Sequence, residues 1–164
     1  MTRHLPRRLL LAVLPLAGCV PPSTPTATAP AAPSPPTLNS LAALATVRFL
    51  DPSRNQATLE LGGGSIIDMT AAPEVRNFNT LRPGARVVVE YEASGTVRIA
   101  RAAQLDRVGR QRATVKEIAV GGAFLVLTLP DGSSQEVALN NPAMMAFATR
   151  LHAGDAVAVT IAPG

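Results

Sequence analysis

The sequence is poor in aromatic residues and has a single cysteine. Phe and Tyr make up 3% of its 164 residues, Trp is absent, and the one cysteine is Cys19. A lone cysteine excludes a disulfide framework within the chain and a cysteine-rich zinc module. Scarce aromatic side chains leave little for a platform on which bases or sugar rings could stack. Hydrophobic residues still reach 47%, which is enough to build a core and excludes wholesale disorder.

The sequence also lacks an apolar run of the ~20 residues that cross a bilayer as a helix. The apolar residues 9–14 follow a basic segment with Arg3, Arg7 and Arg8, and small residues come next. This order is typical of a secretory signal peptide. The signal carries three of the 15 basic residues, so the remainder has 12 against 11 acidic ones, a net charge of +1. Such a balance does not predict nucleic-acid binding.

The motif Leu16-Ala17-Gly18-Cys19 resembles the lipobox of bacterial lipoproteins, in which the cysteine is diacylated and becomes the new N-terminus. The resemblance implies a signal peptide over residues 1–18, a lipid on Cys19 and attachment to the cell envelope. Val20 follows where the inner-membrane retention signal usually has Asp, which implies the outer membrane, periplasmic face. Two or more acyl chains hold a domain stably on a membrane. An ordinary signal peptide with an incidental cysteine is the alternative.

Residues 19–40 are predicted to be a lipid-anchored tether. They are mostly Pro, Ala and Thr, a composition that neither buries a face nor completes a sheet. At roughly 3 Å per residue, such a segment reaches about 50 Å. Binding of a partner that reads polyproline helices is the alternative to a plain spacer.

The rest of the chain contains an internal repeat. Residues 45–47 (Ala-Thr-Val) recur at 113–115, 68 positions later, and residues 81–89 match 151–159 at an offset of 70. A two-residue insertion before the second match explains the change of offset. A repeat of this kind predicts two copies of one structural unit.

Each copy has the period-2 pattern of short strands. In the last matched strand of copy one, Val87, Val89 and Tyr91 are expected to face inward, whereas Glu90 and Glu92 face solvent. Exposed alternating acids of this kind usually serve solubility. Glycine-containing turns separate the strands, as hairpins require.

A short helix is expected in each copy, over residues 72–81 and 141–147, because Pro stands early in both segments. Phe78 and Phe147 hold nearly equivalent positions and are expected to plug the core. The order of three strands, a helix and a further strand is that of the OB-fold and related small barrels.

The predicted fold is therefore mostly β, with two tandem OB-like barrels over residues 41–106 and 107–164 after the signal peptide and the tether. Residues 96–102 supply a fifth strand for the first copy, whereas the second has none of its own. Units this small bury little core and leave open edges. We therefore expect the copies to pack together, with residues 38–45 or the connector covering the missing edge.

The pattern also resembles uncharacterised bacterial envelope proteins built from such barrel units. The resemblance lies in Ala45-Thr46-Val47 with Asp51, in residues 56–59, and in the valines that lead to Tyr91. The second copy departs from it, with Ile161 in place of the tyrosine. The resemblance implies fold and setting only.

Residues for catalysis or metal binding are scarce. The signal peptide removes one of two histidines, and the remaining His152 stands before a strand, where a solvated turn residue is expected. Met69, Met144 and Met145 are interpreted as core residues rather than soft-metal ligands. No Gly-x-Ser-x-Gly, His-Glu-x-x-His or P-loop motif occurs. We expect no enzyme activity, no cofactor and no metal.

Basic residues gather around the connector between the copies. Arg107, Arg110 and Arg112 are candidates for contact with anionic headgroups or an acidic envelope partner, motivated by the tethering. A solvated linker is the alternative interpretation. The function predicted overall is that of a non-catalytic interaction or assembly module of the envelope, with strand-edge pairing to a protein partner as its mode. The alternative is an envelope ligand binder for a polysaccharide, a peptidoglycan fragment or a lipid.

Overall fold

The computed structural model describes residues 33–70, 78–107 and 109–162. The predicted signal peptide, Cys19 and the first part of the tether lie outside these residues. Nine strands, one α-helix, α1 (Pro142–Ala148), and three short 3-10 helices (Phe78–Thr80, Ala102–Asp106 and Val120–Gly122) make up the described fold. The strands are β1 (Leu38–Asp51), β2 (Gln56–Leu61), β3 (Ile66–Thr70), β4 (Arg86–Glu92), β5 (Val97–Arg101), β6 (Gln111–Ile118), β7 (Phe124–Thr128), β8 (Ser134–Ala138) and β9 (Ala156–Ile161). All named pairs are antiparallel, which confirms the prediction of a mostly-β, OB-like fold.

The internal repeat is visible in the hairpin turns. The Gly64 N–H donates to the Leu61 carbonyl at 2.9 Å, and the Gly132 N–H donates to the Leu129 carbonyl at the same distance. Both glycines have φ near +85° (86° and 85°), a conformation that other residues adopt only with strain. The two turns stand 68 positions apart and make the same hydrogen bonds, so the sequence repeat is a structural repeat.

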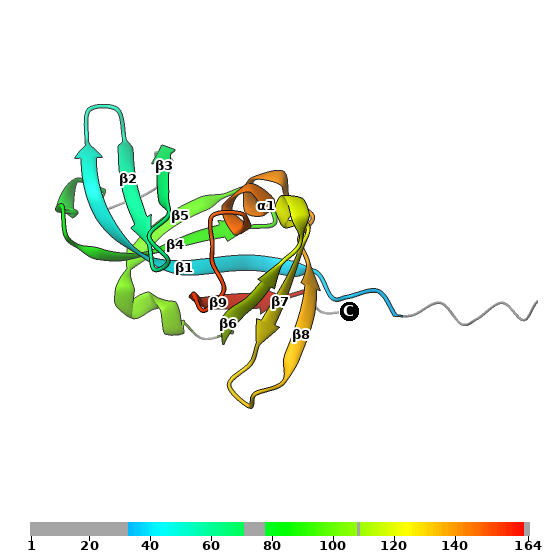
Figure 1. Cartoon of the computed structure of the whole chain (residues 1–164). Coiled ribbons are helices and arrows are strands. Elements are labelled where there is room, and N and C mark those ends of the chain that lie inside the picture. The colour runs from blue at the N-terminus through cyan, green and yellow to red at the C-terminus, as the bar shows by residue number, and fades with distance from the viewer. Residues whose placement is uncertain (1–32, 71–77, 108, 163–164) are drawn as a thin grey trace, which may run out of the picture. The chain divides into compact units, whose positions relative to one another are not determined.

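The first barrel has the strand order β3-β2-β1-β4-β5, and the second has the order β8-β7-β6-β9-β1. Strand β1 is therefore shared, and its N-terminal half takes the fifth-strand position of the second barrel. Leu38 lies opposite Ile161 and Ala43 opposite Val157. Figure 1 shows β1 as one long strand that runs between β4 and β9. The expectation that residues 38–45 cover the open edge is confirmed.

The second barrel is closed by residues that precede β1. Thr37 forms a parallel bridge with Ala138 at the end of β8, and the Ala138 N–H donates to the Pro36 carbonyl at 2.8 Å. The Ala162 N–H donates to the Thr37 carbonyl at 2.9 Å. The fold thus begins before residue 40, the predicted end of the tether. The boundary is corrected because backbone hydrogen bonds to β8 and β9 hold residues 36–40 in place.

The core runs through both barrels as one cluster of buried side chains. Phe78 and Phe147 are both buried, as predicted, and so are Met69 and Met144. Phe147 also stacks on the ring of Tyr91 from the other repeat, with centroids 4.4 Å apart and an interplanar angle of 18°. The repeats therefore share side-chain packing as well as a strand, which confirms that they pack together.

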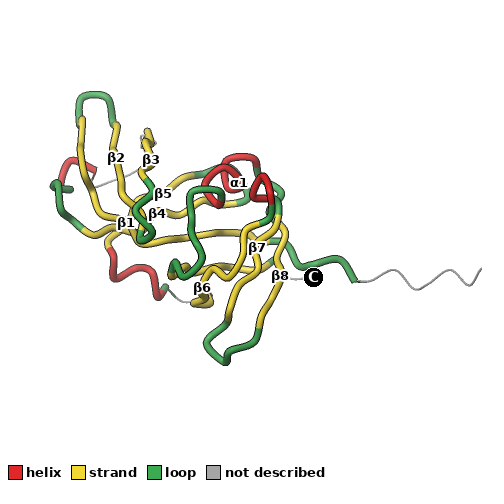
Figure 2. Tube along the Cα trace, in the orientation of Figure 1, coloured by secondary structure: helices red, strands yellow, loops and turns green. Residues whose placement is uncertain are grey.

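The predicted helix of the second copy is α1, coloured red in Figure 2. Asn141 caps it, since its Oδ1 accepts hydrogen bonds from the backbone N–H groups of Ala143 (2.8 Å) and Met144 (3.2 Å). Such a cap stabilises a helix by about 1 kcal/mol. In the first copy the described part of the predicted helix 72–81 holds a 3-10 turn, Phe78–Thr80. Residues 72–77 lie outside the described residues.

Candidate functional site

The connector between the repeats packs across the outer face of the sheet formed by β4, β1 and β9. It comprises the 3-10 turn Ala102–Asp106 and the residues up to Arg110, of which Val108 is outside the described part. Leu105 inserts among Ala42, Val88 and Ala158, all of them buried. Small alanines on β1 and β9 leave the space that the leucine fills. This strip of the sheet is therefore buried on both faces.

Glu90 and Arg110 form a buried ion pair beneath the connector. Their side chains are 9% and 6% exposed, and the Arg110 Nη1 also donates to the Gln104 carbonyl at 2.9 Å. The expectation that Glu90 faces solvent is wrong, because the connector covers its face of β4. Glu92, two residues on, is partly exposed and pairs with Arg98 at 3.0 Å. Arg110 thus holds the connector to the first barrel.

The other two candidate arginines lie in different surroundings. Arg112 forms a solvent-exposed, bidentate pair with Asp106, and its hydrogen bond holds the pKa of that carboxyl below the ordinary value. Arg107 makes no ion pair with any carboxylate of the described chain. The charges of Arg110 and Arg112 are thus balanced by carboxylates of the same chain. Of the three predicted contact residues, Arg107 is the one whose charge remains available to an external anion.

A polar pocket of about 470 Å³ lies beside Arg107 and Arg110. The Oγ of Ser40 is buried there without a hydrogen-bond partner among the described residues. The pocket mixes both charges with hydroxyl and amide groups. Its lining residues are Asn39, Ser40, Glu90, Glu92, Ala93, Ser94, Arg107, Gly109, Arg110 and Thr160.

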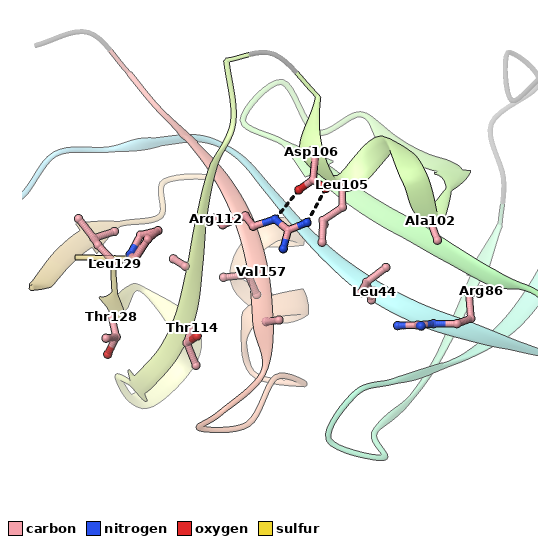
Figure 3. Close-up of a pocket in the computed structure, with 13 residues that line it drawn as sticks. Leu44, Arg86, Ala102, Leu105, Asp106, Arg112, Thr114, Thr128, Leu129 and Val157 are labelled. Atoms are coloured by element: carbon pink, nitrogen blue, oxygen red, sulfur yellow. Dashed lines mark hydrogen bonds and ion pairs between the residues drawn. The ribbon is translucent and has the colours of Figure 1, made fainter. Parts of the chain in front are cut away.

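A second pocket, of about 420 Å³, lies on the other side of Leu105, where the two repeats meet (Figure 3). We call it the junction pocket. Its wall combines apolar side chains with two arginines, one carboxylate and two threonines. The lining residues are Leu44, Arg86, Ala102, Leu105, Asp106, Arg112, Ala113, Thr114, Thr128, Leu129, Pro130, Ala156 and Val157. Arg112 thus lines a different pocket from Arg107 and Arg110.

His152 lies in an exposed turn, as predicted, and it contacts the hairpin turn of the other repeat. Its Nδ1 is 3.4 Å from the Ser65 Oγ. The Asp155 carboxylate accepts a hydrogen bond from the His152 backbone N–H at 2.8 Å rather than from the ring. The contact between His152 and Ser65 ties the turn before β9 to the turn between β2 and β3.

No cluster of three or more His, Cys, Asp or Glu side chains that could hold a metal ion occurs among residues 33–70, 78–107 and 109–162. Within the same ranges, no helix is both long and apolar enough to cross a membrane.

Sheet edges are the other candidate binding surfaces. Among the described residues β3 pairs with β2 alone and β5 pairs with β4 alone, so each leaves one edge without a strand partner. In the second barrel Thr37, just before β1, bridges to Ala138 at the end of β8. Within the described ranges, no such bridge joins β3 to β5 in the first barrel. Phe49, 61% exposed, lies on the outer surface of the same barrel.

The comparisons with known proteins add a likeness to solved structures. No protein-family model and no curated protein matches the chain. Among solved structures, the chain is similar to the cytoplasmic molybdate-binding protein ModG with molybdate bound, at 20% identity and a TM-score of 0.31. The match covers 73% of this chain and 88% of that chain. A likeness at this score carries no argument about function.

Proposed function

We propose that this chain is a lipid-anchored lipoprotein of the bacterial envelope, placed on the periplasmic face of the outer membrane, whose β unit acts as a non-catalytic interaction or assembly module. The lipobox-like motif before Cys19 supports the anchor. The observation that carries the module is the pair of edges on β3 and β5 in the first barrel that have no strand partner among the described residues. An edge strand offers backbone N–H and C=O groups to a strand from another protein.

The anchor is tested by Cys19→Ser in the full-length chain. Without the thioether-linked lipid the protein should leave the membrane fraction, because two or more acyl chains supply the stable attachment. The matched control is Ser23→Ala, a nearby change that leaves the cysteine in place. Quantitative retention of Cys19→Ser in the membrane fraction would overturn the anchor.

The edge is tested by placing a photo-crosslinking amino acid at Arg101, at the end of β5, and at Thr114 as a control. Both positions are exposed, but Thr114 lies on β6 between two strand partners, opposite Thr128 of β7 and Ala156 of β9. A reproducible crosslinked species is expected from position 101 alone. Equal crosslinking from both positions, or none from either, would count against the edge as the binding surface.

A second candidate function, binding of a small ligand, is favoured by the junction pocket. Small-molecule sites are concave, predominantly apolar, of about 300–1,000 Å³, and hold a few convergent polar groups. The junction pocket has this volume and composition, and it lies where two structural units meet. The polar pocket fits the description less well, because Leu, Val and Ile are missing from its wall.

A further inference from the structure

We propose that the junction pocket binds a small organic anion with an apolar body, and that Arg86 holds its charged group. The inference deepens the second candidate function by naming the ligand class. It does not depend on the lipid anchor or on the strand edges.

Arg86 is the charge in this wall that lacks a counterion. It is the first residue of β4, lies opposite Thr46 and is exposed. The structure gives its side chain no hydrogen bond or ion pair with any described residue. Arg112, the other arginine of the wall, is already paired with Asp106. The three charged groups thus leave the pocket with a net charge of +1, located on Arg86.

The rest of the wall is suited to an apolar body. Leu44, Leu105 and Val157 lie between Arg86 and the threonine end of the pocket (Figure 3). In the same view the Arg86 side chain extends toward Leu44. A ligand whose anionic group meets the guanidinium can therefore place its hydrocarbon part on these side chains. Burial of apolar surface then adds to a charge-assisted hydrogen bond.

Thr114 and Thr128 provide hydroxyl groups at the opposite end. They lie opposite each other in the β6–β7 register, and Thr114 also lies opposite Ala156 of β9. Aromatic side chains are missing from the 13 lining residues. Ring stacking therefore does not contribute here, and a nucleotide base would gain little from this wall. A carboxylate or sulfonate on a compact hydrocarbon body fits the wall best.

The test measures binding of 4-phenylbutyrate and octanoate to the full-length protein in non-ionic detergent by equilibrium dialysis, with protein-free micelles as background. The neutral 4-phenylbutyramide reports binding without the charge. Arg86→Gln removes the proposed anchor, and Arg150→Gln is the matched control, because Arg150 is also exposed but lies after α1, outside the pocket. Ala156→Leu fills the pocket.

We expect saturable binding of both anions to the wild type and to Arg150→Gln. Arg86→Gln should weaken anion binding about tenfold, the scale of one charge-assisted hydrogen bond, and leave amide binding unchanged. Ala156→Leu should weaken all three probes. Thermal melting of each variant controls for folding. Absence of saturable binding of either anion up to about 10 mM, or equal anion affinity in wild type and Arg86→Gln, would overturn the proposal. Neither result bears on crosslinking from position 101, so the two proposals fail separately.

Discussion

Breaking the buried pair of Glu90 and Arg110 should cost far more stability than breaking a pair exposed on the surface of the described fold. Removing one partner leaves the other charge buried and uncompensated, which costs about 3–5 kcal/mol in proteins. Both side chains here are less than a tenth exposed. Arg110 keeps one hydrogen bond, to the Gln104 carbonyl, when the carboxylate is lost. We therefore expect Glu90→Gln to lower the free energy of unfolding by about 3 kcal/mol, the lower end of that range.

The measurement is urea unfolding of the full-length chain, followed by the fluorescence of Tyr91, the one tyrosine in a chain without tryptophan. At a slope near 1.5 kcal/mol/M, a loss of 3 kcal/mol lowers the midpoint by about 2 M. Arg110→Met should have a similar cost. The double variant Glu90→Leu/Arg110→Met should be much more stable than the sum of the single changes predicts, because an apolar pair needs no counterion.

Arg48 and Glu60 supply the control, as an ion pair on the surface with side chains 58% and 28% exposed. Glu60→Gln should cost less than about 1 kcal/mol, because water screens the pair. Equal losses for Glu90→Gln and Glu60→Gln would refute the reasoning, and so would strict additivity in the double variant. Either result would mean that the connector does not shield the pair from solvent.

Three further predictions concern the described fold. Leu38→Ala should lower the free energy of unfolding by about 2–5 kcal/mol in urea unfolding, because the side chain is fully buried where β1 completes the second barrel. Gly122→Ala should cost more than about 1 kcal/mol in the same assay, because the glycine has a φ of 72° and a Cβ would overlap the Met145 carbonyl oxygen; an unchanged midpoint would contradict this. The Ser133 hydroxyl and backbone N–H donate to the Asp131 carboxylate and hold the pKa of this carboxyl below its ordinary value of 3.8. The ionised carboxylate therefore adds to the free energy of unfolding above pH 3.8, and this contribution is lost as the pH falls through the lower pKa of the folded state. Asp131→Asn should therefore shrink the fall in urea midpoint below about pH 4, and an identical acid profile would contradict the assignment.

Local pattern and the internal repeat were enough to predict the mostly-β fold, the glycine-containing turns and α1, but not that β1 begins at Leu38, inside the predicted tether. The expectation that Glu90 is exposed failed because period-2 alternation reports the faces of a strand but not what covers them. Val87, Val88 and Val89 in succession depart from alternation, which is the sequence signal of a strand buried on both faces. That signal could have indicated that the connector folds back over β4.

The candidate site was less accessible to sequence reasoning. Clustering in sequence singled out Arg107, Arg110 and Arg112, yet neighbours along the connector point into two different pockets on either side of Leu105. Arg86 was missed because its counterpart in the second repeat is Ala156 and no motif surrounds it. Arg86 becomes a candidate only because it lines the junction pocket, whose wall is built from six elements of the fold. A local sequence pattern cannot show that these elements meet.

The sharing of β1 determines how the protein responds to mechanical load at its N-terminus. The N-terminal half of this strand is flanked by β4 on one side and β9 on the other. Antiparallel hydrogen bonds run perpendicular to the strand direction. A pull along β1 therefore loads many bonds at once in shear, rather than opening them one after another as in a zipper. The same pull acts first on residues 36 and 37, which close the second barrel. Tension transmitted along the chain therefore loads the second barrel before the first.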